Sequence, residues 1–482
     1  MPYFSNFVTQ KFPIFIFSYF VLQIIIRLFT TNIAVLDESE QIMLSQYFAL
    51  GYNEQPPLYT WLQMGVFELF GTSIFGLSLL KNGLLFLTYL FVYKLGILLM
   101  NSRLKASLSA ISLMLIPQLV WGAQVDQTHT VLLTTATAIS IYYFFKIAQE
   151  ESSLLDFIMF GIAIGVGLNA KYNFLLVVVA LIITSLVIKE FRSRFYERRL
   201  IVSIGITLLM VLPHFLWFIS HLEIATNRTI ERMSAGDTQN TIINFFKGNF
   251  SLIVSTIAFL TPFWIAFIVL FRKKFSMSLN DYSKSLLLYM IIIFLFLFLI
   301  ILISGSTHVK ERWLQPYLFL VPLFLFLHVK ILHIDKKVNT FIYLSIFASI
   351  LVTLVVLVKP YMIDLRAKPS RTSYPFEQLS KQIENKIQSS KDVLLYAEDK
   401  YIGGNLKLFL ADSLVITPSL ANQPYDLKNK IVLVWKNQKP INFIEKIGKN
   451  NYKCFSYTEN LPFQHSKKLI YTVNYDVCNK MN

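Results

Sequence analysis

Acidic side chains occur at two places next to long apolar segments, where a carboxylate could act as a general base. Asp37 and Glu38 follow the first apolar segment, and Asp126 lies shortly before another. Each also has a structural interpretation. Asp37 and Glu40 have the spacing of a helix capping box, and Asp126 could cap the helix that follows it. The functional interpretation is that Asp37 faces a cavity at a membrane surface and removes a proton from a hydroxyl group.

Basic side chains that could bind a phosphate lie near the same ends of the apolar segments. Lys171 occupies a very short turn, and a late cluster contains His308, Lys310 and Arg312. The alternative for each is that the side chain extends to lipid headgroups. An electropositive pocket would instead hold the phosphate of a lipid. The sequence has no glycine-rich phosphate loop, which argues against ATP-driven work.

The composition identifies the class of protein to which these residues belong. The chain has 482 residues, of which 55% are hydrophobic and only 15% are charged. Soluble proteins carry about 25% charged residues, so a soluble protein, a disordered chain and a disulfide-rich miniprotein are all excluded. Uninterrupted apolar runs such as residues 291–303 favour a helical membrane protein over a β-barrel.

The apolar segments predict a polytopic helical bundle. Those long enough to cross about 30 Å of hydrocarbon number eleven and cover residues 12–31, 82–100, 106–122, 128–146, 153–168, 172–188, 200–219, 249–271, 285–304, 313–330 and 339–358.

The net charge of +16 is interpreted as a topological signal rather than as a nucleic-acid site. With the N-terminus inside, the inner loops carry sixteen Lys and Arg residues and the outer loops seven. Basic loops stay in the cytoplasm, so we expect a cytoplasmic N-terminus and, after eleven crossings, a C-terminal domain outside.

The first outer loop, residues 32–81, is long and has the pattern of two short helices. The first begins at Leu36 and stops at Gly51, and the second follows Pro56-Pro57 and ends near Gly71. We expect both helices to lie in the membrane interface, with the Pro-Pro pair forcing an extended link between them. Tyr59 lies at the start of the second helix and suits the headgroup level.

Hydrophobicity falls after residue 360, which divides the chain into a membrane domain (1–360) and a soluble domain (361–482). Apolar runs at 393–396, 414–417 and 431–435 predict strands, and segments 406–410 and 441–447 predict helices, so we expect a small α/β domain. Both cysteines, Cys454 and Cys478, fall in this domain. They could pair in an oxidising compartment or remain two free thiols.

Several of these motifs, in this order, resemble one family of membrane enzymes. They are Asp37-Glu38, the stretch 54–61 (Glu-Gln-Pro-Pro-Leu-Tyr-Thr-Trp), Asp126 before a Thr-rich span, the turn 169–172 with its lysine, and the stretch 310–316. The pattern is similar to membrane glycosyltransferases of the GT-C class. Within that class it resembles the bacterial branch of the protein O-mannosyltransferase superfamily, which includes the aminoarabinose transferases of lipid A and the rhizobial galacturonic acid transferases.

The resemblance implies a GT-C bundle, a polyprenyl-phosphate sugar as donor and an active site on the outer side. It makes Asp37 the catalytic or acceptor-positioning carboxylate, with Glu38 assisting and Asp126 as a further acid. The substrate-binding residues would be Tyr59, Lys171, His308, Lys310 and Arg312. One departure is Gln55, because the position before Pro-Pro is often basic in the family.

The expected chemistry is direct displacement with inversion, which requires no nucleotide or redox cofactor. We expect no metal site, although adjacent acids can hold a divalent ion in some relatives. Partners would be membrane lipids and an acceptor that is lipid A, another glycan or a protein, with no nucleic acid. The expected location is a bacterial inner membrane, with the soluble domain in the periplasm. The alternative function is a transporter or flippase for a lipid-linked sugar, although transporters usually place their charges near the membrane midplane.

Overall fold

The computed structural model describes residues 2–195, 197–225, 241–420, 426–447 and 451–481. The chain forms two compact units. The first consists of Met1–Leu22, Ala49–Tyr59 and Lys81–Thr353, and the second of Gln23–Phe48, Thr60–Leu80 and Leu354–Asn482. Much of the first outer loop therefore belongs to the same unit as the C-terminal domain.

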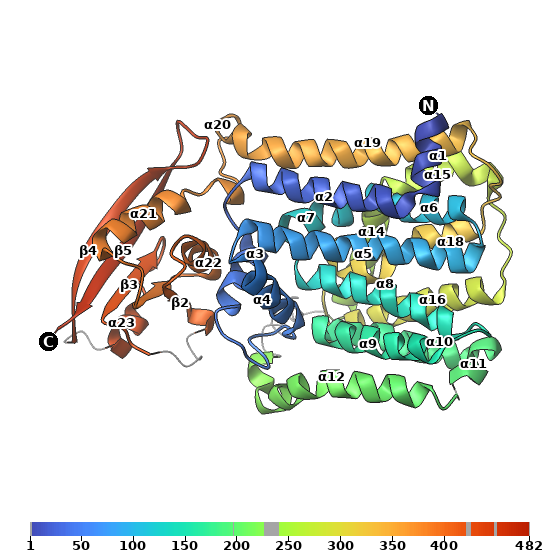
Figure 1. The fold of residues 1–482 in the computed structure, drawn as a ribbon, viewed down its shortest axis with the longest axis horizontal. Coiled ribbons are helices and arrows are strands. Elements are labelled where there is room, and N and C mark those ends of the chain that lie inside the picture. The colour runs from blue at the N-terminus through green and yellow to red at the C-terminus, as the bar shows by residue number, and fades with distance from the viewer. Residues whose placement is uncertain (1, 196, 226–240, 421–425, 448–450, 482) are drawn as a thin grey trace. The chain divides into compact units, whose positions relative to one another are not determined.

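The first unit is a helical bundle whose long helices run beside one another (Figure 1). Helices α2, α5 and α19 begin or end in the second unit. The helices of the first unit are α1 (Pro2–Gln10), α2 (Phe12–Thr30), α5 (Ile74–Met100), α6 (Arg103–Ile111), α7 (Ala123–Asp126), α8 (His129–Ile147), α9 (Leu154–Ala170), α10 (Leu175–Val187), α11 (Lys189–Phe195), α12 (Leu200–Ser220), α14 (Thr241–Leu260), α15 (Phe263–Phe271), α16 (Asp281–Ser304), α17 (Glu311–Leu318), α18 (Val321–Leu327) and α19 (Lys336–Val358).

Each predicted span coincides with one of these helices or with a broken pair of them. In the described part of the chain, seven helices are long and apolar enough to cross a membrane, or eight if one pair bent by 73° is counted as a single span. That pair occupies residues 103–126. Two other predicted spans are also interrupted, at Pro262 between α14 and α15 and at Phe319 between α17 and α18. The prediction of a polytopic helical membrane protein is confirmed.

The second unit contains a five-stranded sheet in the order β2-β1-β3-β5-β4. Its strands are β1 (Val393–Ala397), β2 (Leu414–Ile416), β3 (Lys430–Trp435), β4 (Tyr452–Pro462) and β5 (Ile470–Lys480). The first three are mutually parallel, while β5 is antiparallel to both β3 and β4. The accompanying helices are α3 (Leu36–Leu44), α4 (Leu58–Phe70), α20 (Ile363–Arg366), α21 (Phe376–Ile387), α22 (Lys400–Phe409) and α23 (Ile441–Ile447).

The core of the sheet explains why three of the strands were recognisable in the sequence. All five residues of β1 are buried, as is usual for a parallel strand covered on both faces. On one face Leu394, Ile431 and Leu433 pack with Phe443 of α23. On the other, α22 packs against β1 and β2. The predicted α/β domain is confirmed, with α22 beginning six residues before the segment expected to be helical.

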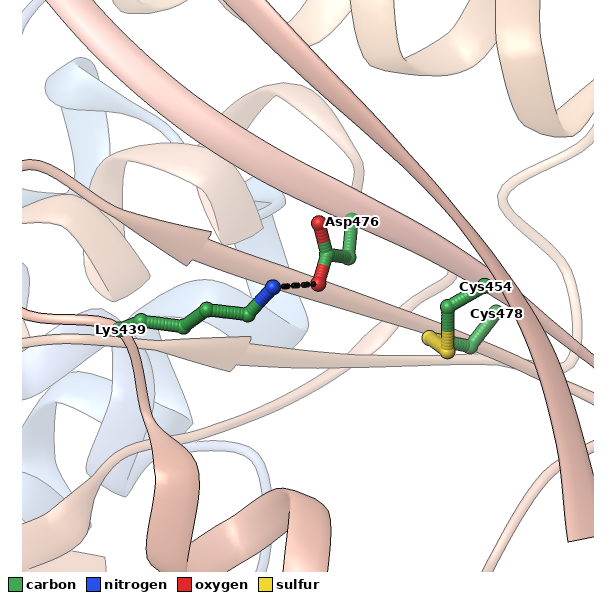
Figure 2. Close-up of a disulfide and its surroundings, with 4 residues drawn as sticks. All are labelled: Lys439, Cys454, Asp476 and Cys478. Carbon is green, nitrogen blue, oxygen red and sulfur yellow. Dashed lines mark ion pairs between the residues drawn. A yellow bond between two sulfur atoms is a disulfide. The ribbon is translucent and has the colours of Figure 1, made fainter. Parts of the chain in front are cut away.

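The hairpin of β4 and β5 was not predicted, because most of β4 is solvent-exposed and has no apolar run. Cys454 and Cys478 lie directly opposite each other on its two strands and form a disulfide (Figure 2). The sequence left open whether these cysteines pair, and the register of the hairpin places them together. The bond closes a loop with a sequence separation of 24.

We expect the double variant Cys454→Ser, Cys478→Ser to destabilise the C-terminal domain by about 3 kcal/mol, because the bond restricts the unfolded chain. Thermal unfolding of the purified protein, with and without reductant, measures this loss. Labelling of both thiols by a maleimide in the untreated, folded wild-type protein would contradict the pairing.

Candidate active site

Helix α3 carries the predicted acidic pair, and its second acid is engaged in structure. Glu38 is only 2% exposed, and its Oε2 accepts hydrogen bonds from the backbone N–H of Val35 at 3.2 Å and from Arg27 at 3.0 Å. Arg27 also donates to the carbonyl oxygens of Thr31 and Ile33, at 2.8 and 2.9 Å. The acid that reaches back to the helix start is therefore Glu38, three residues into the helix, and not Glu40 as the spacing suggested.

The third acid of α3 is also paired. Glu40 forms a salt bridge with Lys400 of α22, with 2.8 Å between Oε2 and Nζ. Asp37 is partly buried and lies about 160° around the helix from Ser39, at 100° per residue. Ser39 contacts α22, and Glu40, which binds Lys400 of the same helix, lies about 60° around α3 from Asp37.

The rest of the first outer loop agrees in part with the sequence prediction. Helix α3 ends at Leu44, seven residues before Gly51, whereas α4 follows the Pro-Pro pair and ends at Phe70, next to Gly71, as expected. The hydroxyl of Thr60 donates to Gln41 Oε1 at 2.8 Å in a buried contact that joins α4 to α3. The apolar side of α3 is covered by protein, because Ile42 packs in a cluster with residues of α4, α5 and α22.

In the first unit, three loops meet around Tyr59. This residue is fully buried at the start of α4, and its ring lies 5.5 Å from the ring of His129 at the start of α8. The next residue of α8, Thr130, lies with its hydroxyl oxygen 3.3 Å from Lys171 Nζ. The structure therefore brings Tyr59 and Lys171 to the same end of α8, three residues after Asp126.

A chain of amide and carboxylate groups connects the late loop to the loop that contains Asp126. Gln118 lies in a π-helical turn, η2 (Gln118–Gly122), and donates to Glu311 Oε2 at 3.0 Å. Its Oε1 accepts from Gln127, which follows Asp126, at 3.2 Å. Glu311 stands between Lys310 and Arg312 at the start of α17. Gln118 has no distinguishing signal in the sequence, where it lies inside the predicted span 106–122.

The three basic residues of the late loop are solvent-accessible. His308, Lys310 and Arg312 are all exposed. Lys310 Nζ lies 6.0 Å from the centre of the Trp313 ring. Below them Gln315 is completely buried and donates to Thr134 of α8 at 3.2 Å, so that the start of α17 is fixed against α8.

Among the predicted site residues, Asp37 and Glu38 belong to the second unit, and Tyr59, Asp126, Lys171, His308, Lys310 and Arg312 belong to the first. Within the described residues, no group of three or more His, Cys, Asp or Glu side chains is arranged to hold a metal ion. The catalytic and substrate-binding roles inferred from the sequence stay predictions at this point.

Comparison with known proteins identifies the family. The chain is 30% identical to the lipopolysaccharide core galacturonosyltransferase RgtA of Rhizobium johnstonii over 431 residues, which is 88% of this chain and 86% of the relative. It is also 30% identical to RgtB of the same organism, another lipopolysaccharide core galacturonosyltransferase, over 87% of this chain and 85% of that protein. Residues 54–217 match the model of the dolichyl-phosphate-mannose-protein mannosyltransferase family.

This chain belongs to the bacterial branch of the protein O-mannosyltransferase superfamily. It is a multi-pass membrane glycosyltransferase. The fold of this glycosyltransferase is that of ArnT from Cupriavidus metallidurans, whose crystal structure in complex with undecaprenyl phosphate superimposes with a TM-score of 0.65. The match covers 97% of this chain and 98% of ArnT at 10% sequence identity. The GT-C fold expected from the motifs is confirmed.

We expect Arg27→Met to destabilise the glycosyltransferase by about 3 kcal/mol, because Glu38 would remain buried without its charge partner. Thermal unfolding in detergent measures the effect. The matched control is Lys381→Met, which removes an ion pair whose side chains are 68% and 40% exposed and should change stability little. Equal melting temperatures for Arg27→Met and wild type would contradict a structural role for this pair.

Proposed function

We propose that this glycosyltransferase transfers a sugar from a polyprenyl-phosphate donor to lipopolysaccharide, with a uronic acid as the sugar. The supporting comparison is the identity of 30% with two galacturonosyltransferases that act on the lipopolysaccharide core. The kind of donor is supported by ArnT, which has the same fold and was crystallised with undecaprenyl phosphate.

We propose Asp37 as the general base of the transfer. The observation that carries this assignment is the place of Asp37 in the first turn of α3, where it is only partly buried. The helix that carries it is fixed by the ion pairs of Glu38 with Arg27 and of Glu40 with Lys400.

The proposed reaction is a single displacement. The acceptor hydroxyl oxygen attacks the anomeric carbon, the bond from that carbon to the phosphate oxygen breaks, and the hydroxyl proton passes to the Asp37 carboxylate. The sugar is inverted at the anomeric carbon, and the polyprenyl phosphate leaves with one additional negative charge. Lys171, Lys310 and Arg312 are the proposed cations that stabilise this charge, as side chains that donate hydrogen bonds to phosphate oxygens.

The proposed mechanism uses no nucleotide, redox cofactor or metal ion. Adjacent acids could in principle hold a divalent cation, but Glu38 already accepts hydrogen bonds from Arg27 and from the backbone of Val35. Both of these hydrogen bonds are accepted by Oε2 of Glu38. We therefore propose that Glu38 positions α3 and has no part in proton transfer.

We further propose that the enzyme lies in a bacterial inner membrane with the C-terminal domain in the periplasm. The excess of Lys and Arg in the loops assigned to the inner side supports this orientation. The disulfide of Cys454 and Cys478 agrees with it, because such bonds persist in the periplasm and are rare in the cytosol.

We expect Asp37→Asn to reduce sugar transfer by at least about 100-fold, because the amide cannot accept the proton of the acceptor hydroxyl. The assay uses purified enzyme, polyprenyl-phosphate galacturonate and lipopolysaccharide that lacks galacturonic acid, with the product detected by mass spectrometry.

Glu68→Gln is the matched control, since Glu68 is an exposed acid on α4, and it should keep full activity. Full transfer by a folded Asp37→Asn enzyme would contradict the assignment of the base. Absence of transfer by the wild-type enzyme with this donor and acceptor would contradict the proposed substrates.

A further inference from the structure

The helix that carries Asp37 is packed against the C-terminal domain at unusually short range. Gly403 and Gly404 of α22 face α3, and a Cβ atom added to Gly404 would lie 2.2 Å from the carbonyl oxygen of Ser39 and 2.6 Å from its Cα. One added at Gly403 would lie 2.8 Å from the sulfur of Met43. No side chain larger than hydrogen fits at Gly404 without separating the two helices.

Two adjacent glycines inside α22 lower the stability of this helix. Each destabilises a helix by about 1 kcal/mol relative to alanine. Helix α22 offsets part of this with a cap, since Asp399 accepts hydrogen bonds from the backbone N–H groups of Tyr401 and Ile402, both at 2.9 Å. Because they have no side chain, the two glycines allow α22 to contact the backbone of α3.

The next residue of α22, Asn405, makes the polar part of this contact. Its side chain is completely buried, and its Oδ1 accepts from the backbone N–H of Ala34 at 2.9 Å. Its Nδ2 donates to the carbonyl oxygen of Ala34 and to the hydroxyl of Ser39, each at 3.0 Å. The amide thus binds both backbone groups of Ala34, two residues before α3 begins, and fixes the start of the helix that presents Asp37.

Contacts at the middle and the end of α3 complete this attachment. Glu40 is bound by Lys400, as described above. Beyond the helix, the side-chain amide of Gln46 donates to the carbonyl oxygen of Val415 at 2.8 Å and accepts from its N–H at 2.9 Å. Val415 lies in β2, the edge strand of the sheet, so that Gln46 pairs with the sheet as a neighbouring strand would.

We infer that the C-terminal domain positions the catalytic helix, and that Asn405 is its main positioning residue. The domain holds α3 through Ser39, Glu40 and Met43, and thereby fixes the position of the helix that carries the Asp37 carboxylate. Asn405 acts through Ala34 and Ser39 and has no contact role in the chemistry. This inference rests on the proposed role of Asp37 as the base.

Loss of the Asn405 amide would leave the backbone N–H of Ala34 buried without its partner, and the carbonyl oxygen of Ala34 would keep only the hydroxyl of Ser39, at 3.2 Å. This loss would allow α3 to shift. We expect Asn405→Ala to lower kcat by about 10- to 100-fold, the effect of a misplacement near 1 Å, and to leave KM for polyprenyl-phosphate galacturonate unchanged. A general loss of folded enzyme would instead reduce activity in proportion to folded protein. The matched control is Asn437→Ala, an exposed asparagine of the same domain, which should leave kcat unchanged.

Exchange of the charges of Glu40 and Lys400 tests the same attachment independently of Asn405. It provides the test of the positioning role if Asn405→Ala does not fold. Lys400→Glu places two acids together and should lower kcat. Adding Glu40→Lys restores an ion pair of reversed direction and should recover kcat. A single variant with full kcat, or a double variant with no recovery, would overturn the inference.

The outcomes separate this inference from the proposed function. If the wild-type enzyme is active, Asp37→Asn is inactive and folded Asn405→Ala retains full kcat, then Asp37 is the base and the positioning role of the domain is refuted. If Asp37→Asn is fully active, the proposed base itself is refuted. A lower kcat in Asn405→Ala with unchanged KM, together with rescue by the charge exchange, supports the inference.

Discussion

The close approach of α22 to the backbone of α3 determines how the helix that carries Asp37 is held in this glycosyltransferase. It requires glycine at position 404, because any Cβ there would meet Ser39. It also brings Asn405 within reach of the backbone just before α3. A short helix of nine residues is not stable alone in water. Helix α3 therefore owes its position to what it is packed against, and most of that is the C-terminal domain.

The charges on α3 follow from the same arrangement. Glu38 forms an ion pair with Arg27, which lies eleven residues earlier in the chain, and Glu40 forms one with Lys400 of α22. Both ion pairs fix the rotation of the helix about its axis. The rotation in turn decides which way Asp37 points. Adjacent acids in the sequence thus have different tasks, two of them structural and one proposed to be catalytic.

Much of the fold could be predicted from the sequence, because apolar length and periodicity determine where membrane helices and buried strands form. The eleven apolar segments coincide with helices, and β1, β2 and β3 coincide with apolar runs. The hairpin of β4 and β5 was missed, because a mostly exposed strand such as β4 has no such signal. The spacing of Asp37 and Glu40 suggested a capping box, but the helix start is set by Val35, which makes Glu38 the capping acid.

The candidate site was less predictable than the fold, because its supports come from segments far apart in the chain. Nothing near Asn405 in the sequence indicates that its amide binds Ala34, some 371 residues earlier. From the sequence alone, the glycine pair that precedes Asn405 indicates only a locally less stable helix. Gln118 and Glu311 likewise meet across 193 residues. Motifs suggested Tyr59 and Lys171 as site residues, which stays a prediction, whereas the contacts with His129 and Thr130 that link their loops required coordinates.

Hydrogen–deuterium exchange reports on the attachment of α3 to the C-terminal domain independently of catalysis, since it measures the stability of the helix itself. The comparison is between the wild-type enzyme and Asn405→Ala, both purified in the same detergent. We expect the amides of residues 36–44 to exchange faster in the variant, while those of α9 in the bundle are unchanged. Equal exchange of residues 36–44 in the two proteins would contradict the claim that the C-terminal domain holds this helix in place.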